Sequence, residues 1–591
     1  MPSAGSVRSR HRPIIYGRTH MVSAGHHHAA QAGFSILEAG GNAVDAGVAS
    51  IMALAVVQPD VVNIAGVAPI LIYLAETGET VSISGLGTWP KAATAEYFER
   101  EHGGAIPEGI LRTVVPGAPD AWITALERYG TMRFGDVAAY AIRLARDGFP
   151  AFAFLTERLH EYEASYRRFP SNTEIYMPGG AIPKPGELFV QADLGRSLQY
   201  MADEEAAAGG REAGLAAARK AFYEGDIART IVAFHEANGG FMTMEDMAGF
   251  RVGHEPPVRS SFGDLDVVSC GPWCQGPVLG QMLNMLDGRD LAALGHNSPD
   301  YIHLLTEVIK LAFADRERHY GDPRFVDVPI EGLLSKAYAE ARMGLFDPEK
   351  AWPAMPPAGD PANAGPRTPD PLPDPVASPL PAPMAAPYRT PPGDESGGDT
   401  SYACVVDRHG NVFSATPSDS SWDGVAVPGT GMVPSSRGSQ SRGDPRHPAS
   451  VAPGKRPRLT PNPAILFRNG RPIMPLGTPG GDAQAQAMLQ VILNMFVFGM
   501  DVQSATEAPR FMSQSFPNSF APNHYFPGRL NLEARLGDAI AAPLAARGHT
   551  LYWWPDWFWR LGSVCAIYID PDTGLLHGGA DPRQESYALG W

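Results

Sequence analysis

The chain has little cysteine, no long apolar run and no excess of positive charge. Its 591 residues include only four cysteines, too few for a disulfide-stabilised fold. Lys and Arg number 47 against 63 Asp and Glu, so a chain-wide basic surface for nucleic acid is excluded. No apolar stretch approaches the roughly 18 residues of a membrane-spanning helix. The basic N-terminus lacks the apolar segment of a secretory signal. We therefore expect a cytoplasmic protein that binds neither nucleic acid nor a membrane.

The sequence also gives no sign of a metal site or a cofactor. Cys270 and Cys274 lie four residues apart, but no second Cys or His pair follows at a zinc-like spacing. The run His26-His27-His28 is consecutive, and neighbouring helical side chains point about 100° apart. These three rings cannot converge on one ion from a single helix. We expect no metal and no cofactor.

At 44% hydrophobic residues the chain has ample material for a large core. Residues 26–58 predict a helical hairpin, residues 68–84 two strands, and 119–350 mostly helix with one strand-like piece at 264–270. Residues 353–392 contain fifteen prolines and little periodicity, which predicts a mobile linker. After it the pattern predicts strands at 402–407, 412–416, 463–467, 472–477, 549–555 and 564–570, with a helix at 482–498.

The junction after the proline-rich segment has the features of a processing site. Asp399-Thr400 stands between the expected linker and a buried-looking strand. If this bond is cut, the Thr400 hydroxyl becomes a nucleophile beside its own α-amine, whose pKa near 8 suits a base. Taken alone, an ordinary Thr at a strand start explains the same residues.

The turn at Gly480-Gly481 joins a predicted strand to a predicted helix. Such a turn exposes backbone N–H groups at the positive end of a helix, which suits an anion or an oxyanion. A tight turn without a ligand is an equally good explanation of these residues alone.

Together with other motifs, these two features resemble the γ-glutamyltranspeptidase family of N-terminal-nucleophile hydrolases. The matching segments run over nearly the whole chain in the same order. They are residues 37–46 (LEAGGNAVDA), 115–118 (VPGA), 239–243 (GGFMT), 312–316 (AFADR), 321–323 (GDP), 399–400 (DT), 455–457 (KRP), 479–481 (PGG) and 579–583 (GADPR).

The resemblance implies an α+β fold, namely a four-layer αββα sandwich. It implies a precursor that cuts itself between Asp399 and Thr400 into a large subunit, 1–399 with a mobile tail at 353–399, and a small subunit, 400–591. In that scheme Thr400 is the nucleophile and Ser418 stands where the family has a second Thr that hydrogen-bonds it. Gly480 and Gly481 form the oxyanion hole.

Several positions that hold the γ-glutamyl group in the family are different here. Leu86 stands where the family has an Arg for the α-carboxylate. Ser420 replaces an Asn, and residues 435–440 contain no carboxylate for the α-amine. The two serines after the Lys-Arg-Pro motif become Leu459 and Thr460. Arg437 is a hypothetical contact for an anionic acyl group, although an exposed loop Arg would fit the pattern as well.

A retained nucleophile with an altered pocket predicts a self-processing amide hydrolase or acyltransferase with a non-glutamyl donor. It would act on a small-molecule amide, as in oxamate amidohydrolase-like and cephalosporin-acylase-like members. Two alternatives stay open. One is a true γ-glutamyltransferase or glutathione hydrolase of glutathione metabolism, with a pocket rebuilt from other residues. The other is a pseudoenzyme that acts as a binding protein. The tryptophans of residues 553–559 either line an acyl pocket or pack in the core.

Overall fold

The computed structural model describes residues 11–368, 372–381 and 399–591, and its centre consists of two antiparallel sheets. The first has seven strands, in the order β1 (Ile15–Gly17), β18 (Leu576–Ala580), β17 (Cys565–Ile569), β13 (Arg471–Gly477), β12 (Ala464–Arg468), β9 (Leu265–Ser269) and β8 (Val258–Phe262). The second also has seven, in the order β19 (Tyr587–Gly590), β2 (Met21–Ala24), β10 (Ala403–Val406), β11 (Val412–Ala415), β3 (Ile70–Leu74), β4 (Glu79–Ile83) and β7 (His254–Glu255).

Alternation along the strands packs the two sheets against each other. In β10, Cys404 and Val406 join a buried cluster that also contains Ile465 and Phe467 of β12 in the other sheet. The side chains between them point to the outer faces, where Ala403 and Val405 enter a different cluster with the helices. Because successive strand residues face opposite sides, each central strand is covered on both faces.

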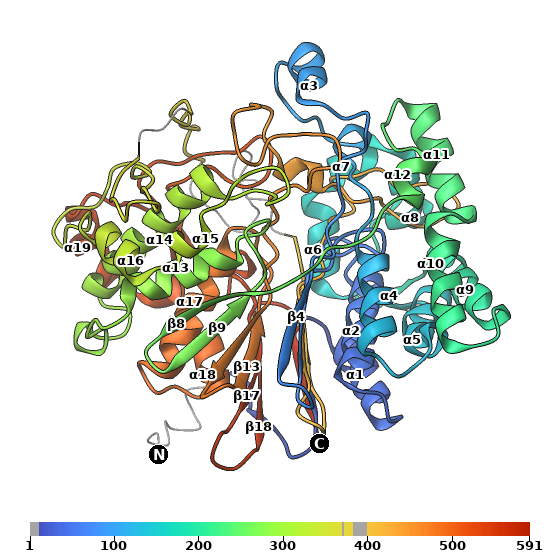
Figure 1. Ribbon diagram of the computed structural model, residues 1–591, viewed down its shortest axis with the longest axis horizontal. Coiled ribbons are helices and arrows are strands. Elements are labelled where there is room, and N and C mark those ends of the chain that lie inside the picture. Colours follow the sequence, from blue (N-terminus) through green and yellow to red (C-terminus); the bar gives the residue numbers. More distant parts are fainter. Residues whose placement is uncertain (1–10, 369–371, 382–398) are drawn as a thin grey trace.

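Helices cover the outer face of each sheet (Figure 1). On the second sheet these include α1 (His27–Glu38), α2 (Ala43–Val57), α4 (Ala118–Tyr129) and α5 (Phe134–Asp147). On the first they include α13 (Gly276–Leu286), α14 (Pro299–His319), α17 (Ala483–Phe496) and α18 (Val502–Glu507). All residues of α2 are buried, as its continuous apolar run requires.

The remaining helices and strands complete the fold. The helices are α3 (Ala95–His102), α6 (Ala153–Glu161), α7 (Glu163–Arg168), α8 (Pro170–Tyr176), α9 (Ala192–Ala207), α10 (Arg211–Tyr223), α11 (Asp226–Asn238), α12 (Met244–Ala248), α15 (Ile330–Leu333), α16 (Lys336–Met343) and α19 (Ala541–Ala546). The strands are β5 (Phe149–Pro150), β6 (Leu188–Phe189), β14 (Phe511–Ser513), β15 (Arg529–Glu533) and β16 (Thr550–Trp554). No helix in the described ranges combines the length and the apolarity that crossing a membrane requires.

The mixed helix-and-sheet class and the helical hairpin near the N-terminus are confirmed. The expectation of one strand-like piece between 119 and 350 was wrong, because β8 pairs with β9 as an edge strand. Its sequence, VRSSF, has only two apolar residues and is half-exposed, so it carries little of the alternation that marks a strand. The short strands β18 and β19 were also missed.

The proline-rich segment is partly in contact with the folded body. Residues 369–371 and 382–398, which belong to the expected mobile tail, lie outside the described residues. Before them, the Arg342 guanidinium donates to the carbonyls of Pro357 and Pro366, and the Gly359 N–H donates to Asp315. These contacts hold residues 353–368 against the helices that cover the first sheet.

Both sheets draw strands from each side of the expected cleavage site. In the second sheet, β10 and β11 lie between β2 and β3. In the first sheet, β12 pairs with β9, which comes from the other side of residue 400. The segments 1–399 and 400–591 are therefore interleaved parts of one body rather than separate folding units.

Candidate functional site

Thr400 lies just before β10 and is completely buried. Its N–H donates to the Val61 carbonyl at 2.9 Å. Its φ is +109°, a region that a β-branched residue rarely adopts. Such strain persists only where surrounding contacts enforce it, and it clusters at functional sites.

Ser418 is the partner of the Thr400 hydroxyl. The two side-chain oxygens lie 2.6 Å apart. The Ser418 backbone pairs with Val67, donating to its carbonyl at 2.9 Å and accepting its N–H at 3.2 Å. The side-chain amide of Gln484 in α17 approaches the same Thr400 oxygen at 3.5 Å. The structure thus brings together the two hydroxyls that the sequence singled out.

Arg437 lies in the site rather than in an exposed loop. Its side chain is 1% exposed, and one guanidinium nitrogen, Nη2, pairs with Asp399 Oδ2 at 2.7 Å. The same nitrogen donates to Ser418 Oγ. The second oxygen of Asp399 lies 3.4 Å from Ser418 Oγ and 3.5 Å from Thr400 Oγ1. Burial raises the pKa of Asp399, although Arg437 opposes this shift.

Asp419 supports Arg437 from the other edge. Its carboxylate lies 3.7 Å from Arg437 Nε and accepts hydrogen bonds from the Ser435 hydroxyl and from the Ser436 N–H and hydroxyl. Burial raises the pKa of Asp419 to about 6. Asp419 also has a positive φ, +114°. The sequence analysis missed it, although an acid beside a predicted catalytic Ser was a usable signal.

Gly480 and Gly481 form the turn between β13 and α17. Their φ values are +120° and +58°, which glycine adopts without steric cost. The Gly481 carbonyl accepts from the Gln275 side chain at 2.8 Å and from the Gln484 N–H at 3.2 Å. Because Gln484 also reaches Thr400, one residue connects this turn to the hydroxyl pair.

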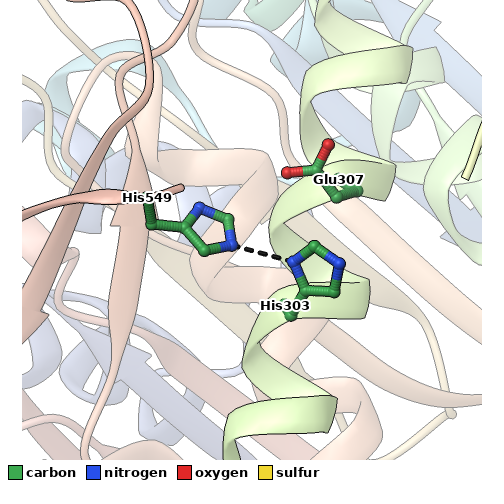
Figure 2. A group of neighbouring side chains, drawn as sticks. All are labelled: His303, Glu307 and His549. Carbon is green, nitrogen blue, oxygen red and sulfur yellow. Dashed lines mark hydrogen bonds between the residues drawn. The ribbon is translucent and has the colours of Figure 1, made fainter. Parts of the chain in front are cut away.

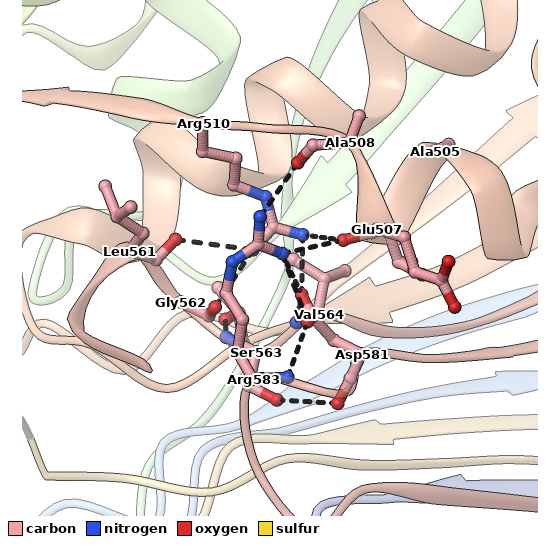
Figure 3. Close-up of polar contacts among 12 residues, drawn as sticks. Ala505, Glu507, Ala508, Arg510, Leu561, Gly562, Ser563, Val564, Asp581 and Arg583 are labelled. Atoms are coloured by element: carbon pink, nitrogen blue, oxygen red, sulfur yellow. Dashed lines mark hydrogen bonds and ion pairs between the residues drawn. The ribbon is translucent and has the colours of Figure 1, made fainter. Parts of the chain in front are cut away.

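A buried ionic network lies beneath the loop at Gly562, which packs near Gly480 (Figure 3 shows the network). Asp581 pairs with Arg510 at 2.6 Å and with Arg583 at 3.1 Å, and all three side chains are fully buried. Arg510 also donates to the Gly562 carbonyl, while the next residue, Ser563, donates its N–H to Thr478 at 2.7 Å. The GADPR motif therefore fixes the loop that packs against the Gly480 turn.

Of the other expected substrate positions, some lie in an apolar cluster and some have polar partners. Leu86 and Leu459 belong to the apolar cluster between the sheets, together with Trp273 and Cys274. Thr460 is buried and exchanges hydrogen bonds with the Gln440 side chain. The position of the missing family Arg is thus apolar.

Ser420 is buried beside the site, with 2% of its surface exposed. Its neighbour Ser421 hydrogen-bonds the Tyr166 hydroxyl at 2.8 Å. Trp559, at the end of the tryptophan segment, packs over the buried Arg158 guanidinium at 4.3 Å. Trp554 lies in a separate small apolar cluster.

Asp60 is a buried acid that the sequence analysis did not single out. It is fully buried, and neither carboxylate oxygen has a hydrogen-bond partner within the described part of the chain. Arg158 Nε is 3.7 Å away. Burial raises the pKa of Asp60 to about 7. The sequence did offer a signal for this acid. Asp60 follows the apolar helix α2 by three residues and stands directly before the apolar residue Val61.

One cluster has ligand types suited to a metal, namely His303, Glu307 and His549 (Figure 2). His303 Nδ1 lies 2.8 Å from His549 Nε2, and His303 Nε2 lies 2.8 Å from the Asp347 carbonyl. Glu307 pairs with the buried Lys310 ammonium at 2.7 Å and accepts the Trp352 N–H. These atoms are engaged in hydrogen bonds, and the Lys310 charge disfavours a cation beside Glu307. The group fits a structural network better than a metal site.

Comparison with known proteins finds relatives that all belong to one family. The family model for gamma-glutamyltranspeptidase matches residues 29–591. An acylase ACY 1 proenzyme of Pseudomonas sp. is 33% identical over 95% of this chain and 92% of its own. The oxamate amidohydrolase proenzyme of Klebsiella pneumoniae is 29% identical over 97% and 98%. The crystal structure of a cephalosporin acylase from Bacillus halodurans superposes with a TM-score of 0.82, at 28% identity over 98% of this chain and 97% of that one. The family-model match over nearly the whole length shows that this chain belongs to the gamma-glutamyltranspeptidase family, whose members include hydrolases and acylases.

Proposed function

We propose that this protein is a self-processing amide hydrolase that works through an acyl-enzyme on Thr400, with a donor other than a γ-glutamyl group. The observation that carries the proposal is the 2.6 Å contact between the Thr400 and Ser418 hydroxyls beside the Gly480-Gly481 turn. The arrangement of helices outside two packed sheets supports an αββα sandwich of the N-terminal-nucleophile type.

Processing comes first in this proposal. Thr400 Oγ1 attacks the Asp399 carbonyl carbon, an ester forms, and the peptide nitrogen becomes the α-amine of Thr400. Water then hydrolyses the ester and separates segment 1–399 from segment 400–591. The positive φ of Thr400 favours this step, because breaking the peptide bond releases the strain.

Turnover repeats the same chemistry on an external amide. The new α-amine takes the hydroxyl proton as Thr400 attacks the donor carbonyl, as in other Thr nucleophiles paired with their own amine. The N–H groups of Gly480 and Gly481 stabilise the oxyanion, a contribution worth about 10²–10³ in turnover for each donor. The amine leaves with a proton, and water releases the acid.

The residues at the positions where the family holds the γ-glutamyl group argue against a γ-glutamyl donor. Its α-carboxylate would face Leu86 and Leu459 in an apolar cluster, and unpaired buried charge is costly. Ser420, Thr460 and Arg437 are the polar groups that we assign to the substrate pocket. A glutathione hydrolase remains the second candidate, because relatives such as the Escherichia coli glutathione hydrolase proenzyme are 30% identical over 94% of this chain.

The test combines processing with activity. Mass spectrometry of the purified protein should show a fragment that begins at Thr400. Thr400→Ala should stay a single chain without amidase activity, while Thr400→Ser should retain some of both, because only the hydroxyl is required. An active wild-type enzyme that remains one intact chain would overturn the proposal. Rapid release of p-nitroaniline from γ-glutamyl-p-nitroanilide would favour the second candidate instead.

A further inference from the structure

A cavity of about 350 Å³ lies at the end of the two sheets opposite Thr400. Strand β10 begins three residues after Thr400 and ends at Val406, which lines the cavity. Strand β13 likewise runs from Arg471, in the cavity wall, to Gly477 near the Gly480 turn. The length of β10 alone, roughly 13 Å at 3.3 Å per residue, therefore separates this cavity from the nucleophile. In Figure 1 these strand ends lie at the bottom of the sheets, beside the label C.

Three arginine side chains line this cavity, and each comes from a different segment. Arg18 lies in the link between β1 and β2, Arg408 in the turn between β10 and β11, and Arg471 at the start of β13. The backbone N–H groups of Arg18 and Thr19 donate to the Trp591 carbonyl at 2.7 and 2.6 Å, which fixes the first of these segments. All three arginines are exposed, and they reach the cavity from both sheets.

In the described part of the chain, none of these three guanidinium groups has a carboxylate partner. Their one side-chain hydrogen bond is a long contact of 3.4 Å from Arg408 to the Leu37 carbonyl. The acid in the cavity wall, Asp407, accepts the backbone N–H groups of Ala43 and Asn411 and the Asn411 side-chain amide. A chain with a net charge of −16 thus leaves three positive charges together without an internal counter-charge.

The shape of the cavity strengthens its attraction for an anion. Its floor includes the buried side chains of Val406 and Leu576 and the ring of Tyr73. A concave site with charges of one sign and apolar walls concentrates the electric field and the counter-ion. Exposed arginines elsewhere differ, since Arg196 and Arg229 each pair with an aspartate three residues away.

We propose that this cavity binds a small polyanion of the phosphate type, whose charges are shared among Arg18, Arg408 and Arg471. The planar guanidinium fork matches the spacing of phosphate oxygens and binds them with two parallel hydrogen bonds. A ligand with two or more negative charges can contact arginines from both sheets at once. It would therefore bridge the two sheets at the end that lies away from Thr400.

The first experiment titrates the purified full-length protein with pyrophosphate in a calorimeter, at low salt and at ~0.15 M salt. We expect one site per chain and an affinity that falls as salt rises. Tighter binding of ADP than of pyrophosphate identifies the phosphate end of an organic molecule as the ligand, and the reverse order identifies an inorganic polyanion. Citrate, whose charges are carboxylates, should bind more weakly than both. Citrate binding as tightly as pyrophosphate, or no binding of either phosphate compound, would overturn the inference.

The second experiment locates the site. Arg408→Met and Arg471→Met should each weaken pyrophosphate binding by about 10-fold, which corresponds to the loss of one charge-assisted hydrogen bond. Arg133→Met removes the same charge from an exposed position at the start of α5 and should leave the affinity unchanged. Equal affinities of the wild type and both cavity variants, or equal losses in all three variants, would overturn the inference.

Thermal melting provides the folding check and an independent measurement. Without ligand, the variants should melt at the temperature of the wild type, because the three arginines have no ion-pair partner among the described residues. Pyrophosphate should raise the melting temperature of the wild type more than that of Arg471→Met, since a ligand stabilises the state that it binds. Thr400→Ala should bind pyrophosphate like the wild type, so the result does not depend on the proposed function. Loss of binding in Thr400→Ala would place the anion in the reaction site and overturn the inference.

Discussion

At the scale of single residues, the site depends on a strained Thr400 held by specific contacts. Its positive φ is compatible with the hydrogen bond from its N–H to Val61 and with the short contact to Ser418. Asp419, next to Ser418, is also at positive φ. Strained residues of this kind cluster at functional sites, which is consistent with the proposed role of Thr400 and Ser418.

Gly481 gives the first prediction at this scale. Gly481→Val should lower turnover by at least about 10²-fold. A β-branched residue is strained at φ near +58°, so the backbone shifts and the Gly481 N–H no longer points at the oxyanion. Steady-state amidase assays on folded protein, checked by circular dichroism, measure the effect. Gly210→Val, at an open position without a close neighbour, is the control. Near-normal turnover of folded Gly481→Val would contradict the oxyanion assignment.

At the scale of elements, the segment 58–67 between α2 and β3 wraps the nucleophile. Val61 accepts the Thr400 N–H, Asn63 donates to the Asp419 carbonyl at 2.8 Å, and Val67 pairs with Ser418. Asp60 lies in the same segment without a hydrogen-bond partner for its carboxylate among the described residues. Because a buried carboxylate without a hydrogen bond is costly, Asp60 is expected to lower the stability of the folded chain when it is ionised.

Asp60 predicts a pH-dependent stability. Its pKa is raised to about 7, so the folded chain keeps a proton that the unfolded chain releases near pH 4. Stability is therefore lost as pH rises from about 4 to 7 and stays level above that. In a Thr400→Ala background, urea titration should show that Asp60→Asn raises the unfolding free energy by up to about 3 kcal/mol more at pH 8 than at pH 5. The exposed Asp203→Asn should show no such difference between the two pH values. A pH-independent gap for Asp60→Asn would contradict the assignment.

At the scale of the whole molecule, segments 1–399 and 400–591 form one body. Both sheets contain strands from each side of residue 400, so segments 1–399 and 400–591 share three buried clusters. The network of Arg510, Asp581 and Arg583 lies entirely within segment 400–591 and fixes its last strands against the turn at Gly480.

This network gives the last prediction. Arg583→Met leaves Asp581 and Glu533 with a buried partner missing, and breaking a buried ion pair typically costs about 3–5 kcal/mol. The melting temperature should fall clearly. Arg229→Met removes an exposed pair with Asp226 and should change stability by less than about 1 kcal/mol. Equal melting temperatures for the two variants would show that the network does not hold this loop.

The sequence by itself determined the family, the mixed class and the residues of the hydroxyl pair and the glycine turn. The mixed class follows from periodicity along the chain. The family, the hydroxyl pair and the role of the glycine turn follow from the resemblance of many motifs in the same order, since Thr400 and the two glycines taken alone have ordinary explanations. It did not determine the surroundings of Arg437, which a loop pattern cannot distinguish from an exposed arginine. Nor did it identify Asp60, because its burial depends on contacts with distant segments such as the one that carries Arg158. It also missed Asp419, because its role depends on the loop fold that brings Ser435, Ser436 and Arg437 onto its carboxylate. Only the tertiary structure brings Asp399 onto Arg437, since that contact requires the two sheets, the segment 58–67 and the loop after β11 to pack together.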